Sequence, residues 1–81
     1  MSKRYNYDYS RLKDRIAKKY GTLTKFSEAM DCNVSTMSMR LTNRAEWPQG
    51  DIIKAKELLR ISNRDIGAFF YTTNVQKDWA N

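Results

Sequence analysis

The chain contains no histidine, and Cys32 is its one cysteine. Zinc clusters and internal disulfides are therefore excluded, because each needs more than one such side chain. Nucleophilic catalysis is disfavoured too, since no histidine is present to activate the thiol. We therefore expect a protein that is not an enzyme, with no cofactor, no metal and no small-molecule substrate, in which Cys32 is a structural thiol.

Long apolar runs are also missing. No stretch reaches the roughly 20 residues that a membrane-spanning helix needs, and the basic N-terminus has no apolar run behind it. We expect no membrane contact and, with so little cysteine, cytoplasmic residence. The 81 residues predict a single domain near the lower size limit for a self-sufficient core. Its stability margin should be slim unless dimerisation adds to it.

Acidic residues are scarce in the first half of the chain. Residues 1–44 contain ten lysines and arginines but four acidic residues, whereas residues 45–81 contain five of each. The whole formal charge of +6 therefore lies in the first half. Positive charge gathered in one part of a small domain favours nucleic-acid binding over a merely solvated surface.

The segment from Lys25 to Arg44 has the pattern of a helix-turn-helix. Apolar residues four apart predict an inner stripe on two short helices, over residues 23–30 and 34–42. The intervening Asp31, Cys32 and Asn33 have poor helix propensity, and Asn33 is a good N-cap for the second helix. The stripe residues are Phe26 with Met30, and Met37 with Leu41.

The outer face of the second helix of this motif is small and uncharged. It carries Val34, Ser35, Ser38, Met39 and Thr42. A helix face that is only solvated usually carries charged residues such as Glu and Lys. This face is therefore suited to pressing against another surface.

A first helix is predicted over residues 9–19, capped by Asp8 or Ser10, with one or two tyrosines stapling its entry. Gly21 occupies the position where a left-handed residue closes a helix. Thr22 then caps the next helix, whose exposed N-terminal amides are suited to phosphate. Lys25 stands in the first turn, where the helix dipole disfavours a cation, which is a modest hint of a bound anion.

Two further helices are predicted over residues 51–60 and 63–71, the second capped by Ser62. Pro48 prevents the helix of the motif from continuing, and Trp47 is expected to cover the junction before the fourth helix. The chain ends are treated as an N-terminal arm, residues 1–7, and a C-terminal tail, residues 72–81. Lys3 and Arg4 could lie along a phosphate backbone or be simply solvated. The tail, with Val75 and Trp79, could pair across a two-fold axis, fold back or fray.

Several quoted segments together resemble one family of regulators. They are RYNYDYSRLKDRI, KKYGT, FSEAM, STMSMRLTN, the following tryptophan, and IGAFFY with VQ after it. The chain resembles the Cro/CI-like helix-turn-helix repressors of bacteriophages, most closely the small Cro-type proteins of temperate phages of Gram-positive bacteria. The resemblance implies an all-α, compact five-helix lambda-repressor-like DNA-binding domain with a short C-terminal tail. It also implies a transcriptional regulator of the choice between lysis and lysogeny, acting in the bacterial host cell.

The resemblance also implies the residues that face the bases of double-stranded operator DNA. This base-facing set, with Thr36 added, is Asn33, Val34, Ser35, Thr36, Ser38, Met39 and Thr42. The predicted phosphate set is Thr22, Thr24, Lys25, Arg40, Asn43 and Arg44, where Arg40 and Arg44 could also reach bases but phosphate is favoured for both. Two departures from the family pattern stand out. Leu23 replaces a common glutamine and has no donor for phosphate, and Asp31 replaces the usual turn glycine, which suggests a slightly altered turn.

The resulting hypothesis is repression by occupancy, with two copies on a pseudo-palindromic site. With no Arg or Gln in the middle of the reading face, thymine methyl contacts and DNA shape would carry much of the specificity. The alternative is a protein-interaction module, antirepressor-like or antitoxin-like, in which Trp47, residues 69–71 and Trp79 form a docking surface. RNA binding is less favoured, because no aromatic platform stands out on a basic face.

Overall fold

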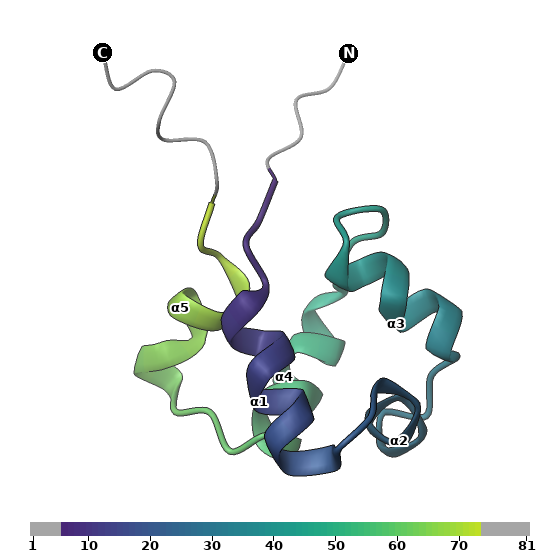
Figure 1. Ribbon diagram of the computed structural model, residues 1–81. Coiled ribbons are helices and arrows are strands. Elements are labelled where there is room, and N and C mark those ends of the chain that lie inside the picture. The colour runs from purple at the N-terminus through teal and green to yellow at the C-terminus, as the bar shows by residue number, and fades with distance from the viewer. Residues whose placement is uncertain (1–5, 74–81) are drawn as a thin grey trace.

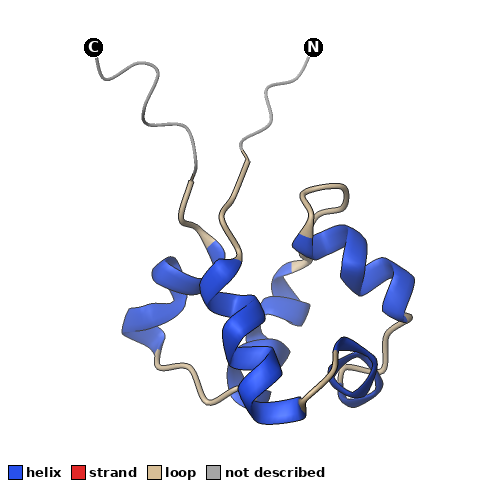
Figure 2. Ribbon diagram, in the orientation of Figure 1, coloured by secondary structure: helices blue, strands red, loops and turns tan. Residues whose placement is uncertain are grey.

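In the computed structural model, which describes residues 6–73, the chain folds into short helices around one core (Figure 1). Figure 2 shows helices joined by loops, with no strand in this part of the chain. The predicted all-helical fold with five α-helices is confirmed. The elements are α1 Ser10–Tyr20, α2 Leu23–Ala29, α3 Val34–Leu41, α4 Gln49–Leu58, a 3₁₀ turn Asn63–Asp65, and α5 Ile66–Phe70.

The helix boundaries of the motif follow local chemistry. Gly21 closes α1 with a φ of 82°, which glycine adopts without steric cost. The Thr22 side chain accepts a hydrogen bond from the Lys25 amide at 3.2 Å, and the Asn33 side chain accepts one from the Ser35 amide at 3.1 Å. Both predicted N-caps are therefore confirmed. Asp31, in the turn between α2 and α3, takes the left-handed conformation with φ of 59°, so the turn forms without a glycine.

Helix ends were predicted less well. The fourth helix was predicted over residues 51–60, but α4 begins directly after Pro48, its N-cap, and ends two residues early. It cannot include Arg60, because that residue has a φ of 56°. The helix predicted over residues 63–71 begins with a 3₁₀ turn, Asn63–Asp65, continues directly into α5, and ends one residue early at Phe70. Ser62 does not cap the backbone there, since its hydroxyl lies 3.1 Å from the Asp65 carboxylate.

The other helices are shifted by one residue. The first was predicted over residues 9–19 but runs over Ser10–Tyr20, and α2 and α3 each end one residue earlier than predicted. At the start of α1 the Asp8 carboxylate accepts hydrogen bonds from both the hydroxyl and the amide of Ser10. These bonds lower the pKa of Asp8. The N-cap position of α1 is Tyr9, which makes no side-chain cap hydrogen bond, so the prediction of Asp8 or Ser10 as the cap was wrong.

The core lies between α1 and the other helices. Figure 1 shows α1 in the middle, with α5 on one side of it and α2 and α3 on the other. Leu12 and Ile16 of α1 are buried, as are the predicted inner stripes of α2 and α3. The core residues are Tyr9, Leu12, Ile16, Phe26, Met30, Met37, Leu41, Ile52, Ala55, Leu59, Ile61, Phe69 and Phe70.

The two described chain ends lie side by side. Tyr7 and Thr73 form a single antiparallel bridge, and the Asp8 amide donates to the Thr72 carbonyl at 2.7 Å. Tyr9 is buried, and its ring lies 6.1 Å from that of Tyr7, so the predicted tyrosine staple at the entry to α1 is confirmed. The first two residues of the predicted tail, Thr72 and Thr73, therefore pair with the segment that leads into α1.

Part of the predicted arm and tail lies outside the described residues. This applies to Lys3, Arg4, Val75 and Trp79. Among the helices of residues 6–73, none is long and apolar enough to cross a membrane.

Candidate nucleic-acid interface

Helix α3 divides into a buried and an open face. Met37 and Leu41 point into the core and are 0% and 6% exposed. The opposite face is open, with Val34 and Met39 exposed at 40% and 39%. The structure leaves the predicted base-facing residues Asn33, Val34, Ser35, Ser38, Met39 and Thr42 exposed and Thr36 half-buried. The sequence-based division of this helix into two faces therefore agrees with the structure.

Two polar side chains of this face, Asn33 and Thr42, are oriented by local hydrogen bonds. The Thr42 hydroxyl donates to the Ser38 carbonyl at 2.9 Å, so it offers only a lone pair to an outside donor. The Asn33 oxygen is used in capping, so its amide NH₂ remains as a donor. The Ser38 hydroxyl has no hydrogen-bond partner among the described residues. The face thus presents both donors and acceptors, although few of them.

Four of the six predicted phosphate residues lie at the surface. Lys25 and Arg44 are exposed cations at the two ends of the motif, one in the first turn of α2 and one just after α3. Thr22 and Thr24 are exposed at the start of α2. These four positions are compatible with the predicted phosphate contacts.

Arg40 does not fit the predicted phosphate role. Its side chain is turned into the domain, where its guanidinium lies 2.9 Å from the Asp51 carboxylate and 5.5 Å from the Trp47 ring centroid. The residue is 9% exposed. The physical reason is helical spacing, since Arg40 follows Met37 by three residues and shares its inner side of α3. Arg40 therefore joins α3 to α4.

Asn43 is likewise engaged within the domain, contrary to the predicted phosphate contact. Its side-chain oxygen accepts from the Tyr7 amide at 2.9 Å, and its NH₂ group donates to the Tyr7 carbonyl at 2.9 Å. Both ends of the amide are thus used. Asn43 also has a φ of 65°, a conformation that asparagine tolerates better than most residues. It therefore ties the end of α3 to the entry of α1.

Replacing Asn43 tests this tie. We expect Asn43→Gly to lower the free energy of unfolding by about 1–3 kcal/mol, because the two hydrogen bonds are lost. This variant adds no backbone strain, since glycine accepts the left-handed conformation. Asn43→Ala should cost about 1 kcal/mol more, because alanine strains that backbone. Urea unfolding followed by circular dichroism measures both. An Asn43→Gly variant as stable as the parent chain would contradict the assignment.

Helix α4 holds the motif at two points. Besides the Asp51 contact with α3, the Lys54 ammonium donates to the Met30 carbonyl, at the C-terminal end of α2, at 3.2 Å. Lys54, a basic residue of α4, therefore helps to hold the fold together. The same is true on α1, where Arg15 donates to the Leu59 carbonyl at 2.7 Å.

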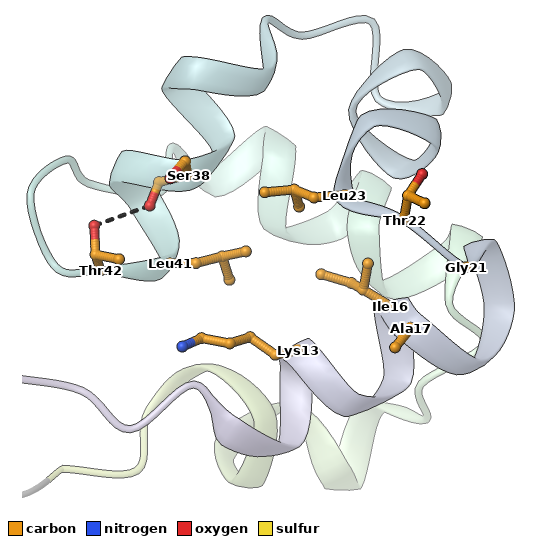
Figure 3. Close-up of a pocket in the computed structure, with 9 residues that line it drawn as sticks. All are labelled: Lys13, Ile16, Ala17, Gly21, Thr22, Leu23, Ser38, Leu41 and Thr42. Carbon is orange, nitrogen blue, oxygen red and sulfur yellow. Dashed lines mark hydrogen bonds between the residues drawn. The ribbon is translucent and has the colours of Figure 1, made fainter.

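A hollow with a volume of about 320 Å³ lies between α1, the start of α2 and α3 (Figure 3). Its apolar wall is built by Ile16, Ala17, Leu23 and Leu41. Its polar residues include Ser38 and Thr42 from the predicted base-facing set and Thr22 from the predicted phosphate set. The hollow therefore adjoins the candidate interface.

Lys13 also lines this hollow, and sequence reasoning did not single it out. It is one of five basic residues on α1, and its spacing alone does not distinguish it from the others. The signal that could have found it is its placement one turn before Ile16, on the side of α1 that turns toward α3.

The aromatic residues of the alternative docking surface are mostly buried. Trp47 packs on the core as predicted, with its ring edge-on to Phe70 at 5.2 Å between centroids. Phe69 and Phe70 are buried, whereas Tyr71 is 53% exposed. Burial also raises the pKa of the neighbouring Tyr9 phenol. Among the described members of that surface, only Tyr71 is open to a partner.

Comparisons with known proteins point to phage regulation. No curated protein matches the chain. Among solved structures, it is similar to the solution structure of the modulator of repression (MOR) of the temperate bacteriophage TP901-1 from Lactococcus lactis. The two share 35% identity over 82% of this chain and 89% of the other, with a TM-score of 0.72. This likeness supports a small phage regulatory protein with an all-helical fold.

A family model also matches residues 5–73. These residues include α2, α3 and every residue of the core. The chain therefore belongs to the family described as "Protein of unknown function (DUF739)".

Proposed function

We propose that this chain is a phage transcriptional regulator of the Cro type that binds double-stranded operator DNA with α3 in the major groove. The observation that carries the proposal is the open face of α3. It is exposed and uncharged, and two exposed cations belong to the same motif, Lys25 in the first turn of α2 and Arg44 just after α3. A reading helix between phosphate-binding groups has this arrangement, because phosphate contacts position a protein and base contacts specify the site.

The chemistry of the face predicts how the sequence is read. Val34 and Met39 are suited to thymine methyl groups, and Ser38 can bond to several base edges. The lone pair of Thr42 fits a base amino group, since its proton is given to its own helix. With so few donors, DNA shape and bridging water carry much of the specificity.

Repression then follows from occupancy of a promoter. Two copies bind a pseudo-palindromic site with half-sites about one helical turn apart. The solved relative is named a modulator of repression, which agrees with a role in the choice between lysis and lysogeny.

Selection of bound sites from random DNA duplexes tests the proposal directly. We expect an enriched motif with two-fold symmetry, and an affinity for random duplexes that falls steeply as salt increases. Failure to enrich any motif, together with no binding to duplexes in dilute buffer, would refute it.

Two single substitutions separate recognition of the base sequence from binding to the phosphate backbone. Ser38→Ala should change the selected motif more than it changes affinity for random duplexes. Lys25→Ala should weaken binding to all duplexes alike and lower the salt slope by about one unit. Fluorescence anisotropy titrations on selected and random duplexes measure both effects. Equal loss on both duplexes in Ser38→Ala would count against the groove assignment.

A second candidate function is a protein-interaction module, antirepressor-like or antitoxin-like. Two observations favour it: the apolar Val34 and Met39 are exposed on α3, and Arg40 and Asn43 are engaged inside the domain rather than offered to phosphate. Binding to a single protein partner in a 1:1 complex that salt does not weaken, with no duplex binding, would support this function instead.

A further inference from the structure

We propose that the hollow between α1 and α3 seats the sugar–phosphate backbone of a DNA strand, with Lys13 as a phosphate contact supplied by α1. This inference rests on the proposed function and extends it, because it adds a helix outside the helix-turn-helix to the interface. The argument uses the shape of the hollow, the chemistry of its walls and the charges around it.

The position of the hollow makes it continuous with the interface. Ser38 and Thr42 form one side of it, and both belong to the face proposed to read bases (Figure 3). Thr22, of the predicted phosphate set, forms another side. A strand whose bases meet α3 must pass its backbone beside that helix, and the hollow is an open recess there.

The walls suit a sugar better than a phosphate. Ala17, Leu23 and Leu41 give the recess an apolar surface, which packs against the C–H groups of a deoxyribose but cannot solvate a charge. The volume of about 320 Å³ is about ten times the share of one water molecule in the liquid, so a sugar ring has room.

The positive charge of Lys13 lies at the edge of the hollow, where it can contact the phosphate next to a sugar bound there. Figure 3 shows the Lys13 side chain extending along the edge of the hollow opposite Leu41 and Thr42. Two other cations of α1 have partners elsewhere, since Arg15 donates to the Leu59 carbonyl and Lys18 lies 3.6 Å from the Asp14 carboxylate. Neither Arg11 nor Lys19 lines the hollow. Lys13 is therefore the cation of α1 that combines exposure with contact to the hollow.

Two substitutions test the charge and the recess separately. Lys13→Gln removes the cation, and Lys19→Gln is its matched control, being an exposed lysine of the same helix that does not line the hollow. Ala17→Leu fills the recess without changing charge, and leucine preserves helix propensity. Affinity and salt slope are measured on selected and random duplexes, and thermal unfolding checks that each variant is folded.

We expect Lys13→Gln to lower the salt slope by about 0.9, the value for one lost phosphate contact, and Lys19→Gln to change it clearly less. Ala17→Leu should weaken binding to all duplexes by about threefold to tenfold, because a displaced strand loses a phosphate contact. Equal slopes for the two lysine variants would overturn the role of Lys13. Unchanged DNA affinity in Ala17→Leu would show that no DNA strand binds in the recess. The recess would then fit an apolar side chain of a partner protein instead.

These outcomes can be told apart from failure of the proposed function. If the parent chain selects a DNA motif that depends on Ser38, but the variants of the hollow bind as it does, only this inference fails. If the parent chain binds no duplex at all, both fail.

Discussion

Replacing Met39 with glutamate is expected to abolish specific DNA binding while leaving the fold intact. Met39 is 39% exposed, so the carboxylate can reach water in the isolated protein. In the complex it would face base acceptors and nearby phosphates. Juxtaposed like charges cost several kcal/mol, and each 1.4 kcal/mol is a factor of ten, so we expect at least about a 100-fold loss of affinity.

The chain offers a matched control in Ile53. It is also an exposed apolar residue on a helix, at 49%, but it belongs to α4 and lies outside the proposed interface. Ile53→Glu changes the net charge by the same amount, so any general effect of charge appears in both variants. We expect its affinity to fall no more than about threefold, as for the loss of one distant charge. Similar losses in the two variants would mean that α3 does not enter the groove.

Features set by neighbouring residues could be predicted from the sequence. The caps at Thr22 and Asn33 and the closing Gly21 each depend on the chemistry of a few adjacent positions. The inner stripes of α2 and α3 depend on a spacing of four residues, which is visible in any single helix. The division of α3 into two faces follows from this spacing.

Features set by distant residues could not be predicted in this way. Whether Arg40 reaches DNA or the domain depends on Asp51, which belongs to another helix. The position of Arg40 three residues after Met37 was a usable signal, but its charge argued for the surface. Asn43 is tied to Tyr7, 36 residues away, and no local pattern indicates that contact. The hollow forms only when α1, α2 and α3 are packed together. The sequence alone therefore did not indicate that Lys13 lines it.

Arg40→Met is the second substitution with a large expected effect, and it acts on stability rather than on phosphate binding. Removing one partner of a buried ion pair costs about 3–5 kcal/mol. The Asp51 side chain is 38% exposed and is partly solvated by water, which reduces the expected loss to about 2–3 kcal/mol. A domain of 81 residues has only about 4–12 kcal/mol in total, so the melting temperature should fall by many degrees.

The double variant Arg40→Met with Asp51→Asn shows whether the loss comes from the pair. It removes both charges, so it should recover part of the stability that the single variant loses. Arg44→Ala serves as the comparison for DNA, since Arg44 is exposed and carries the same charge. We expect it to lower the salt slope of duplex binding by about one unit with unfolding unchanged. At a temperature where Arg40→Met is folded, its salt slope should equal that of the parent chain. A slope lowered by one unit with unchanged stability would instead make Arg40 a phosphate ligand, and Asp51 would then hold it in place only until DNA arrives.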